Sequence, residues 1–143
     1  MITLIKKYKK EIFNYVIFGT LTAVVNLVVK YLLLFTIFDP QNSFQLQTSI
    51  VISWIAAVLF AYITNRKYVF KSENENKLKE FISFIIARLS TLFMEMAIMW
   101  FFVTLLKLNS DSWVIVFTLI AQAVVIISNY IFSKLFIFKK ADK

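Results

Sequence analysis

The sequence contains neither cysteine nor histidine. Without cysteine these residues can form no disulfide and no thiolate metal site, and without histidine they lack the commonest metal ligand and general base. We therefore expect no metal site and no hydrolysis by a histidine-based triad. No cofactor and no catalytic residue are predicted, and the chain is not expected to be an enzyme.

Polar residues are also scarce. Hydrophobic residues make up 60% of the 143-residue chain, and there is one glycine and one proline. Soluble proteins average roughly 45 to 50% apolar residues. A water-soluble domain of this length needs a polar exterior, and too few polar residues are present to cover one. The exterior is therefore expected to face lipid.

Four apolar segments are long enough to cross a hydrocarbon layer about 30 Å thick, which needs ~20 helical residues. They lie near residues 13–37, 47–67, 81–106 and 112–135. Polar stretches at residues 39–43, 71–80 and 108–112 separate them. The segments lack the strict alternation of barrel strands, so an all-α membrane protein with four transmembrane helices is predicted.

The basic residues indicate the orientation of these helices, because short cytoplasmic loops carry excess lysine and arginine. Thirteen of the sixteen basic residues fall before the first helix, around the middle connection or after the last helix: Lys6, Lys7, Lys9, Lys10, Arg66, Lys67, Lys71, Lys77, Lys79, Lys134, Lys139, Lys140 and Lys143. Both termini are therefore expected to be cytoplasmic. The net charge of +8 is interpreted as topology and contact with anionic lipid heads, and no nucleic-acid partner is expected.

The chain repeats itself. An offset of 68 residues aligns Tyr62 with Tyr130, Asn65 with Ser133, Arg66 with Lys134, and Phe70 with Phe138. An offset of 69 aligns Glu11 with Glu80, Tyr15 with Phe84, Thr22 with Thr91, and Asn26 with Glu95. The sequence thus predicts a single membrane domain over residues 1–143, built from two helix hairpins. Repeat 1 spans about 8–71 and repeat 2 about 77–140. Two crossings per hairpin make the repeats parallel, and a site is expected between them.

Polar residues inside the spans are the candidates for such a site. Two sets recur at helical spacing, and each set shares one helix face: Thr22, Asn26 and Lys30, and Arg88, Thr91 and Glu95. A charge at the centre of a membrane helix costs roughly 2.5 to 3.5 kcal/mol, so it usually marks a pathway or a pairing. Lys30 could pair with Glu95, which would leave Arg88 for another anion.

Structural interpretations exist beside the functional ones. The three charges could form an internal ion-pair network, and the long Lys30 side chain could reach the outer interface. Gln122 and Asn129 are expected to hydrogen-bond between helices. Close packing of helices is the expected role of the small residues Ser53, Ala57 and Ala61.

Three motifs carry a resemblance to a known family. They are FNYVIFGTLTAVVN at 13–26, NRKYVF at 65–70 and its degenerate copy SKLFIF at 133–138. With these motifs the chain resembles the GtrA-like family of small four-helix membrane proteins, from about Tyr8 to Lys139. It departs from the family at two places. Only Gly19 remains of the usual glycine pair, and the fourth helix carries Ser-Lys where the second helix has Asn-Arg.

The resemblance implies a flippase that moves a polyprenyl-phosphate-linked monosaccharide across the inner cell membrane for glycosylation of cell-surface glycans, beside membrane glycosyltransferases. On this hypothesis Arg66 and Lys134 attract the phosphate, Arg88 receives it inside the membrane, and Asn26 and Glu95 hydrogen-bond the sugar. The candidate substrate-binding residues are Asn26, Lys30, Asn65, Arg66, Arg88, Glu95, Asn129 and Lys134.

Two alternatives remain open at this point. A small multidrug-type exporter would use Glu95 as a proton and cation site, although Lys30 and Arg88 make the interior net positive. A membrane scaffold for a glycosyltransferase would need no transport path at all. A homodimer is compatible with each of these functions.

Overall fold

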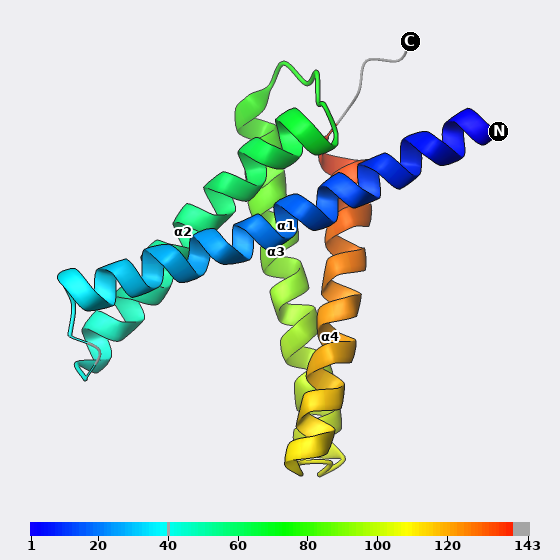
Figure 1. Cartoon of the computed structure of the whole chain (residues 1–143). Helices are drawn as coiled ribbons and strands as arrows, with labels where there is room; N and C mark the ends of the chain where they lie inside the picture. Colours follow the sequence, from blue (N-terminus) through cyan, green and yellow to red (C-terminus); the bar gives the residue numbers. More distant parts are fainter. Residues whose placement is uncertain (40, 139–143) are drawn as a thin grey trace. The chain divides into compact units, whose positions relative to one another are not determined.

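The computed structural model describes residues 1–39 and 41–138, and all regular structure in these two ranges is helical (Figure 1). The helices are α1 (Ile2–Thr36), α2 (Ser43–Thr64), α3 (Lys77–Met99) and α4 (Asp111–Phe132). Three π-helical segments continue them: η1 (Asn65–Val69), η2 (Trp100–Leu105) and η3 (Ser133–Ile137). The four continuous helices that result are each long and apolar enough to span a membrane. The predicted all-α, multi-pass membrane fold is confirmed.

The orientation of the termini stays a prediction. Four residues used in the sequence analysis, Pro40, Lys139, Lys140 and Lys143, lie outside the described residues.

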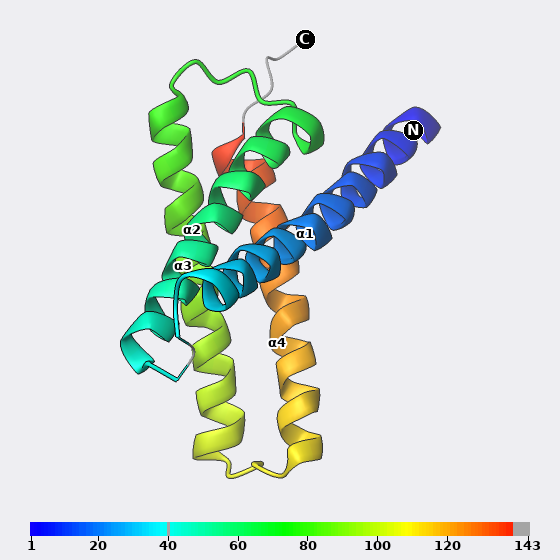
Figure 2. The same cartoon turned by 60° about the vertical axis from the view of Figure 1, so that its left-hand side comes forward.

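The chain divides into two compact units, Met1–Ser72 and Glu73–Lys143. Each unit is one hairpin, in which α1 packs against α2 or α3 packs against α4 (Figures 1 and 2). We call these units the first and the second hairpin.

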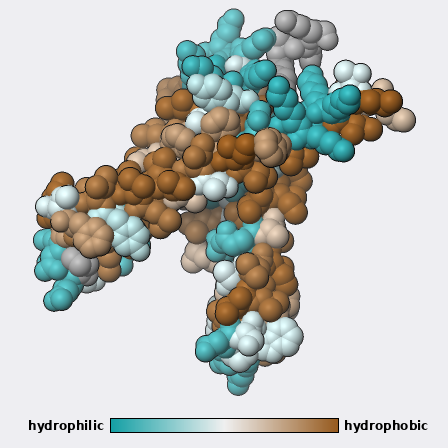
Figure 3. Space-filling model, in the orientation of Figure 1, coloured by the Kyte–Doolittle hydropathy of each residue, from teal (hydrophilic) through white to brown (hydrophobic). Residues whose placement is uncertain are grey.

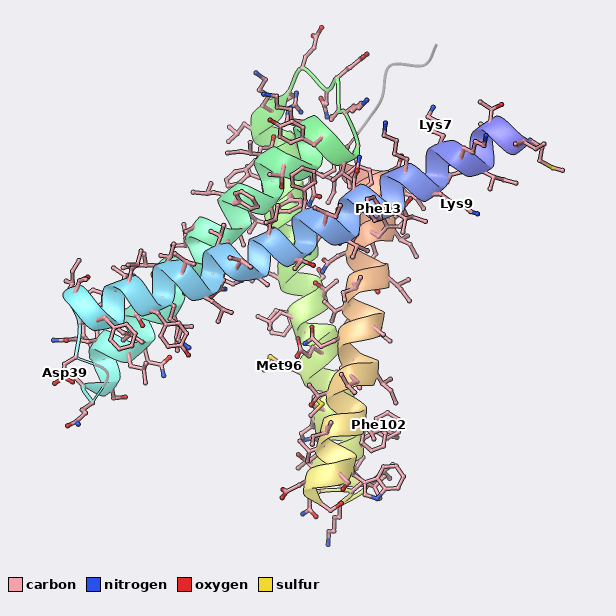
Figure 4. The ribbon with its side chains drawn as sticks, in the orientation of Figure 1. Lys7, Lys9, Phe13, Asp39, Met96 and Phe102 are labelled. Atoms are coloured by element: carbon pink, nitrogen blue, oxygen red, sulfur yellow. The ribbon has the colours of Figure 1, made fainter. Side chains whose placement is uncertain are left out.

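In the first hairpin α1 begins at Ile2, well before the predicted span that starts near residue 13. Lysine and leucine are good helix formers, and no glycine or proline precedes Gly19, so the helix has no reason to start later. Its 35 residues extend about 52 Å, which exceeds the hydrocarbon thickness of ~30 Å. Lys7 and Lys9 point away from this N-terminal stretch (Figure 4).

The second helix of the first hairpin starts at a side-chain cap. The Asn42 carboxamide oxygen accepts hydrogen bonds from the backbone N–H groups of Phe44 and Gln45, at 3.1 and 3.2 Å. One face of α2 then carries small residues that are buried: Ser49, Ser53, Ala57 and Ala61. Both serine hydroxyls on this face donate to backbone carbonyls of α2 itself. The predicted packing role of this small-residue face is consistent with its burial.

Both hairpins end their last helix in a π-helical turn at equivalent positions. In η1 the Phe70 N–H donates to the Asn65 carbonyl, and in η3 the Phe138 N–H donates to the Ser133 carbonyl, each at 2.9 Å. The ring of Phe70 lies 6.1 Å from that of Tyr15, and the ring of Phe138 lies 5.9 Å from that of Phe84. π-Helical turns are rare and are frequent at functional sites, so their recurrence at the same repeat position singles this region out.

The π turn has a packing consequence. An α-helix turns about 100° per residue, so in a regular helix Phe70 would lie about 140° round the axis from the buried Asn65. A π turn closes its hydrogen bond one residue later and holds more residues per turn, which brings Phe70 back toward the face of Asn65. Phe70 is accordingly 2% exposed. The same argument applies to Ser133 and Phe138.

Hydrophobic side chains cover most of the visible surface along the helices, and hydrophilic ones gather at the helix ends and connections (Figure 3). Exposed large residues such as Leu27, Phe93 and Leu119 are 53%, 65% and 65% accessible. A protein in water would not leave such residues exposed along every helix, whereas lipid solvates them.

Candidate functional site

The first hairpin carries a basic and aromatic cluster at η1. Asn65 is buried at the start of the turn, and Arg66 is half-buried. Arg66 Nη1 donates to Ser72 Oγ at 3.4 Å, in the connection that follows η1. The exposed Tyr68 ring stacks on Phe18 of α1, with centroids 5.3 Å apart. The π turn therefore places a guanidinium group and an aromatic ring at the exit of the helix, which suits the headgroup boundary of a membrane.

The second hairpin repeats this arrangement at η3. Ser133 is buried, and the half-buried Lys134 donates from Nζ to the Tyr130 hydroxyl at 3.0 Å. The Lys134 ammonium also lies 5.3 Å from the centre of the Tyr130 ring. Arg66 and Lys134 thus occupy equivalent positions in the two hairpins. Their convergence on one entrance stays a prediction.

Two carboxylates at these helix exits were not among the predicted site residues. Glu11 on α1 and Glu80 on α3 are only 6% and 2% exposed, and each lies one turn before the aromatic residue that contacts the π-turn phenylalanine. A buried carboxylate needs partners, and within the described residues every buried side-chain nitrogen or oxygen has a hydrogen-bond partner. The alignment of Glu11 with Glu80 was the sequence signal that could have identified them.

Arg88 lies inside the third membrane-spanning helix and rests on an aromatic ring. Its guanidinium carbon is 4.8 Å from the centre of the Phe84 ring, which is fully buried. Among the described residues of its own hairpin, Arg88 is partnered by this cation–π contact and by no carboxylate. Arg88 is half-buried, so its charge lies within the span without an acidic partner among the described residues of its own hairpin.

Polar side chains of α3 are engaged by α4. The Thr91 hydroxyl lies 3.0 Å from two acceptors, Asn129 Oδ1 of α4 and the Arg88 carbonyl of its own helix, and both Thr91 and Asn129 are buried. One turn further, Gln122 Nε2 donates to Glu95 Oε1 at 2.7 Å. The predicted interhelical hydrogen bonds of Gln122 and Asn129 are confirmed. A further role for Asn129 in substrate binding stays a prediction.

The polar residues of α1 are placed differently. The Thr22 hydroxyl donates to the Phe18 carbonyl of its own helix at 2.8 Å. Asn26 and Lys30 are half-buried, and among the described residues of the first hairpin neither side chain makes a hydrogen bond or an ion pair. Since Lys30 and Glu95 belong to different hairpins, their pairing stays a prediction.

The Thr91–Asn129 hydrogen bond gives a first testable prediction. Thr91→Val and Asn129→Leu should each destabilise the protein, and the double variant should lose less than the sum of the two. The coupling free energy should be about 0.6 kcal/mol and no more than ~1.7 kcal/mol, as for other interhelical hydrogen bonds in membranes. Reversible unfolding in mixed micelles measures it, and strictly additive losses would contradict the contact.

A family model described as GtrA/DPMS, transmembrane domain, matches residues 14–138. The matched region covers α1 from residue 14 onward, the whole of α2, α3 and α4, and the π turns at η1 and η3.

Three relatives are similar over 132 residues, or 90% of this chain. A cell wall teichoic acid glycosylation protein GtcA from Listeria monocytogenes serovar 1/2a is 31% identical, and 85% of its length is covered. The protein of the same name from Listeria innocua serovar 6a is 34% identical over the same share. An uncharacterized membrane protein YwcD from Bacillus subtilis strain 168 is 31% identical, with 97% of its length covered. No solved structure matches the chain significantly.

Proposed function

We propose that this chain, which belongs to the GtrA/DPMS transmembrane-domain family, translocates a polyprenyl-phosphate-linked monosaccharide across the cell membrane for glycosylation of the cell wall. The names of its relatives support the process, since two of them are cell wall teichoic acid glycosylation proteins. The charged and polar residues of the spanning helices support a phosphate-linked sugar as the substrate.

The observation that carries the proposal is Arg88. Keeping an arginine within a membrane helix costs roughly 2.5 to 3.5 kcal/mol, and no carboxylate among the described residues of its hairpin offsets that cost. A phosphate group that enters the membrane faces the matching difficulty, because its charge loses its hydration. Arginine binds phosphate through several N–H donors at once, so each charge removes the penalty of the other.

The basic residues at the helix exits would collect the substrate before it reaches Arg88. Arg66 and Lys134 are half-buried at η1 and η3, where a cation can meet a lipid phosphate without leaving the headgroup layer. Asn65 begins the turn that positions Arg66. The exposed apolar helix surfaces would receive the polyprenyl chain, and Asn26, whose amide has no partner among the described residues of its hairpin, would hydrogen-bond the sugar.

In this mechanism the protein breaks no bond. It acts as a transporter beside the membrane glycosyltransferases that make the lipid-linked sugar and use it. The protein lowers the cost of crossing by supplying partners to the phosphate and the sugar within the hydrocarbon region.

A proton-coupled cation exporter is less well supported. Such a protein needs a carboxylate that is available for protons and cations, but Glu95 already accepts a 2.7 Å hydrogen bond from Gln122. The other charges within the spans, Lys30 and Arg88, are positive and repel cations.

The proposal can be tested in the cells that make the protein. Loss of the gene should remove the sugar from the cell wall and raise the amount of lipid-linked sugar, because synthesis continues on the cytoplasmic face while its export stops. Mass spectrometry of extracted lipids and wall polymers measures both quantities. A loss of wall sugar with no accumulation of the lipid would instead favour the scaffold, since a scaffold would be needed to make the lipid.

A further inference from the structure

The two repeats differ along one pair of equivalent helix faces. On α1 we define the α1 stripe as Gly19, Thr22, Asn26 and Lys30, whose spacings of three and four residues place them on one face. An offset of 69 residues carries this set onto the α3 stripe, which consists of Arg88, Thr91, Glu95 and Met99. The two stripes are therefore comparable position by position.

The α3 stripe is bound to its own hairpin. After Arg88, each of its members lies beside a polar group of α4: Thr91 contacts Asn129 at 3.0 Å, Glu95 contacts Gln122 at 2.7 Å, and the Met99 sulfur lies 3.8 Å from the Thr118 hydroxyl oxygen, which also donates to the Val114 carbonyl at 2.7 Å. This regular series of contacts holds α3 and α4 together.

The α1 stripe has no such series among the described residues of the first hairpin. The positions on α2 that correspond to Asn129, Gln122 and Thr118 at an offset of 68 are Ala61, Trp54 and Ile50. None of these side chains can accept a hydrogen bond, and only the indole of Trp54 can donate one. The Thr22 hydroxyl turns back to its own helix, and a Cβ atom added at Gly19 would meet nothing within 4 Å.

A polar stripe without polar partners is costly in a membrane. An amide that loses its hydrogen bonds in an apolar medium costs several kcal/mol, so Asn26 needs a partner from outside its hairpin. The head of a phosphate-linked sugar supplies matching groups. The Asn26 amide can donate to one sugar hydroxyl and accept from another, and Lys30 offers a point charge to the phosphate.

We infer that the α1 stripe is the surface that recognises the sugar of the transported lipid, so that the first hairpin determines which sugar is accepted. This inference rests on the proposed function. The α3 stripe contributes Arg88 for the phosphate, while Thr91, Glu95 and Met99 hold the second hairpin together. Gly19 leaves open, on the α1 stripe, the position that Arg88 fills on the α3 stripe, and this opening gives room for a sugar ring.

The inference is tested by binding, with the full-length protein in detergent. The probes are polyprenyl phosphate without a sugar, polyprenyl-phosphate glucose and polyprenyl-phosphate N-acetylglucosamine. Asn26→Ala should weaken binding of the preferred sugar lipid by about 3- to 10-fold, the effect of one or two lost hydrogen bonds, and should leave binding of polyprenyl phosphate unchanged. The preference of the wild-type protein between the two sugars should be reduced accordingly.

A matched pair of threonines provides the control. Thr20 and Thr22 both donate to a carbonyl four residues earlier on α1, at 3.0 and 2.8 Å, but only Thr22 lies on the α1 stripe. Thr22→Val should reduce the preference between sugars, and Thr20→Val should leave it at the wild-type value. Equal effects of the two variants would overturn the inference.

Exchanging the charges of Lys30 and Glu95 tests whether Lys30 pairs with Glu95 instead of binding the substrate. If Lys30 pairs with Glu95, the double variant Lys30→Glu, Glu95→Lys should bind like the wild type, and the inference would be wrong. If Lys30 serves the substrate, the double variant should bind all three probes more weakly than the wild type. Failure of the proposed function is a separate result, because a protein that discriminates between sugars in detergent but moves none of them in vesicles recognises its lipid without transporting it.

Discussion

Arg88→Ala should abolish translocation of the lipid-linked sugar while the protein stays folded. Arg88 makes no ion pair with the described residues of its hairpin, so its removal leaves no carboxylate of that hairpin unpaired. On the proposed function, it also removes the charge that receives the phosphate within the membrane. Loss of one partner of a desolvated charge pair costs 2 to 5 kcal/mol, so the transport rate should fall by at least about 30-fold. Transport by purified protein in lipid vesicles measures the rate.

Arg88→Lys is the matched control for this variant. Lysine keeps the charge but loses the planar set of N–H donors and much of the stacking on Phe84. Transport should therefore be intermediate between that of the wild type and that of Arg88→Ala. Full activity of the alanine variant would exclude Arg88 from the phosphate path.

Phe84→Ala should have the largest effect on stability. The Phe84 side chain is fully buried, contacts the ring of Phe138 after η3 and supports the guanidinium of Arg88. Truncation of a buried phenylalanine usually costs 3 to 5 kcal/mol, and here it removes the packing of the π turn as well. The unfolding free energy in mixed micelles should fall by about 3 kcal/mol or more.

Phe84→Leu separates the two roles of this ring. Leucine retains much of the buried volume, so most of the stability should return, but it has no aromatic face for Arg88. We expect transport to remain reduced in this variant although its unfolding curve approaches that of the wild type. Full recovery of both properties would mean that the cation–π contact has no part in transport.

The number and type of the helices could be predicted from the sequence because the spans are long and nearly uncharged. Length and hydropathy suffice for that, since only a helix satisfies the backbone of a single apolar segment in lipid. The first residue of α1 could not be predicted in the same way. The lysines at positions 6–10 stand before the apolar run and mark the limit of the hydrocarbon region, but the helix continues past them to Ile2.

The π turns could not be read from the sequence. NRKYV and SKLFI are compatible with a regular helix, and the π turns accompany contacts of Phe70 and Phe138 with aromatic rings on the neighbouring helix. Those partners, Tyr15 and Phe84, are about 55 residues away in the chain. A repeated motif indicates that a position matters, but it does not give the geometry.

The candidate site was predicted in part. Intramembrane polarity made Asn26, Lys30, Arg88 and Glu95 candidates, because charged and polar side chains are costly within a span. Which of them have partners within their hairpin depends on helix rotation, and that is why the Glu95–Gln122 contact could not be assigned in advance. Glu11 and Glu80 escaped notice because an acidic residue beside lysines at a helix end looks like an ordinary surface residue, whereas both are buried.

On the proposed function, this protein carries a lipid-linked sugar across a membrane by binding its phosphate at Arg88. The most direct measurement uses vesicles that contain the purified protein and a polyprenyl-phosphate monosaccharide whose sugar is oxidised by a reagent that cannot cross the membrane. Without protein, only the outer half of the lipid should react. With the wild-type protein nearly all of it should react, and with Arg88→Ala the fraction should return to one half. A wild-type protein that leaves half of the lipid protected would show that the protein does not translocate this lipid.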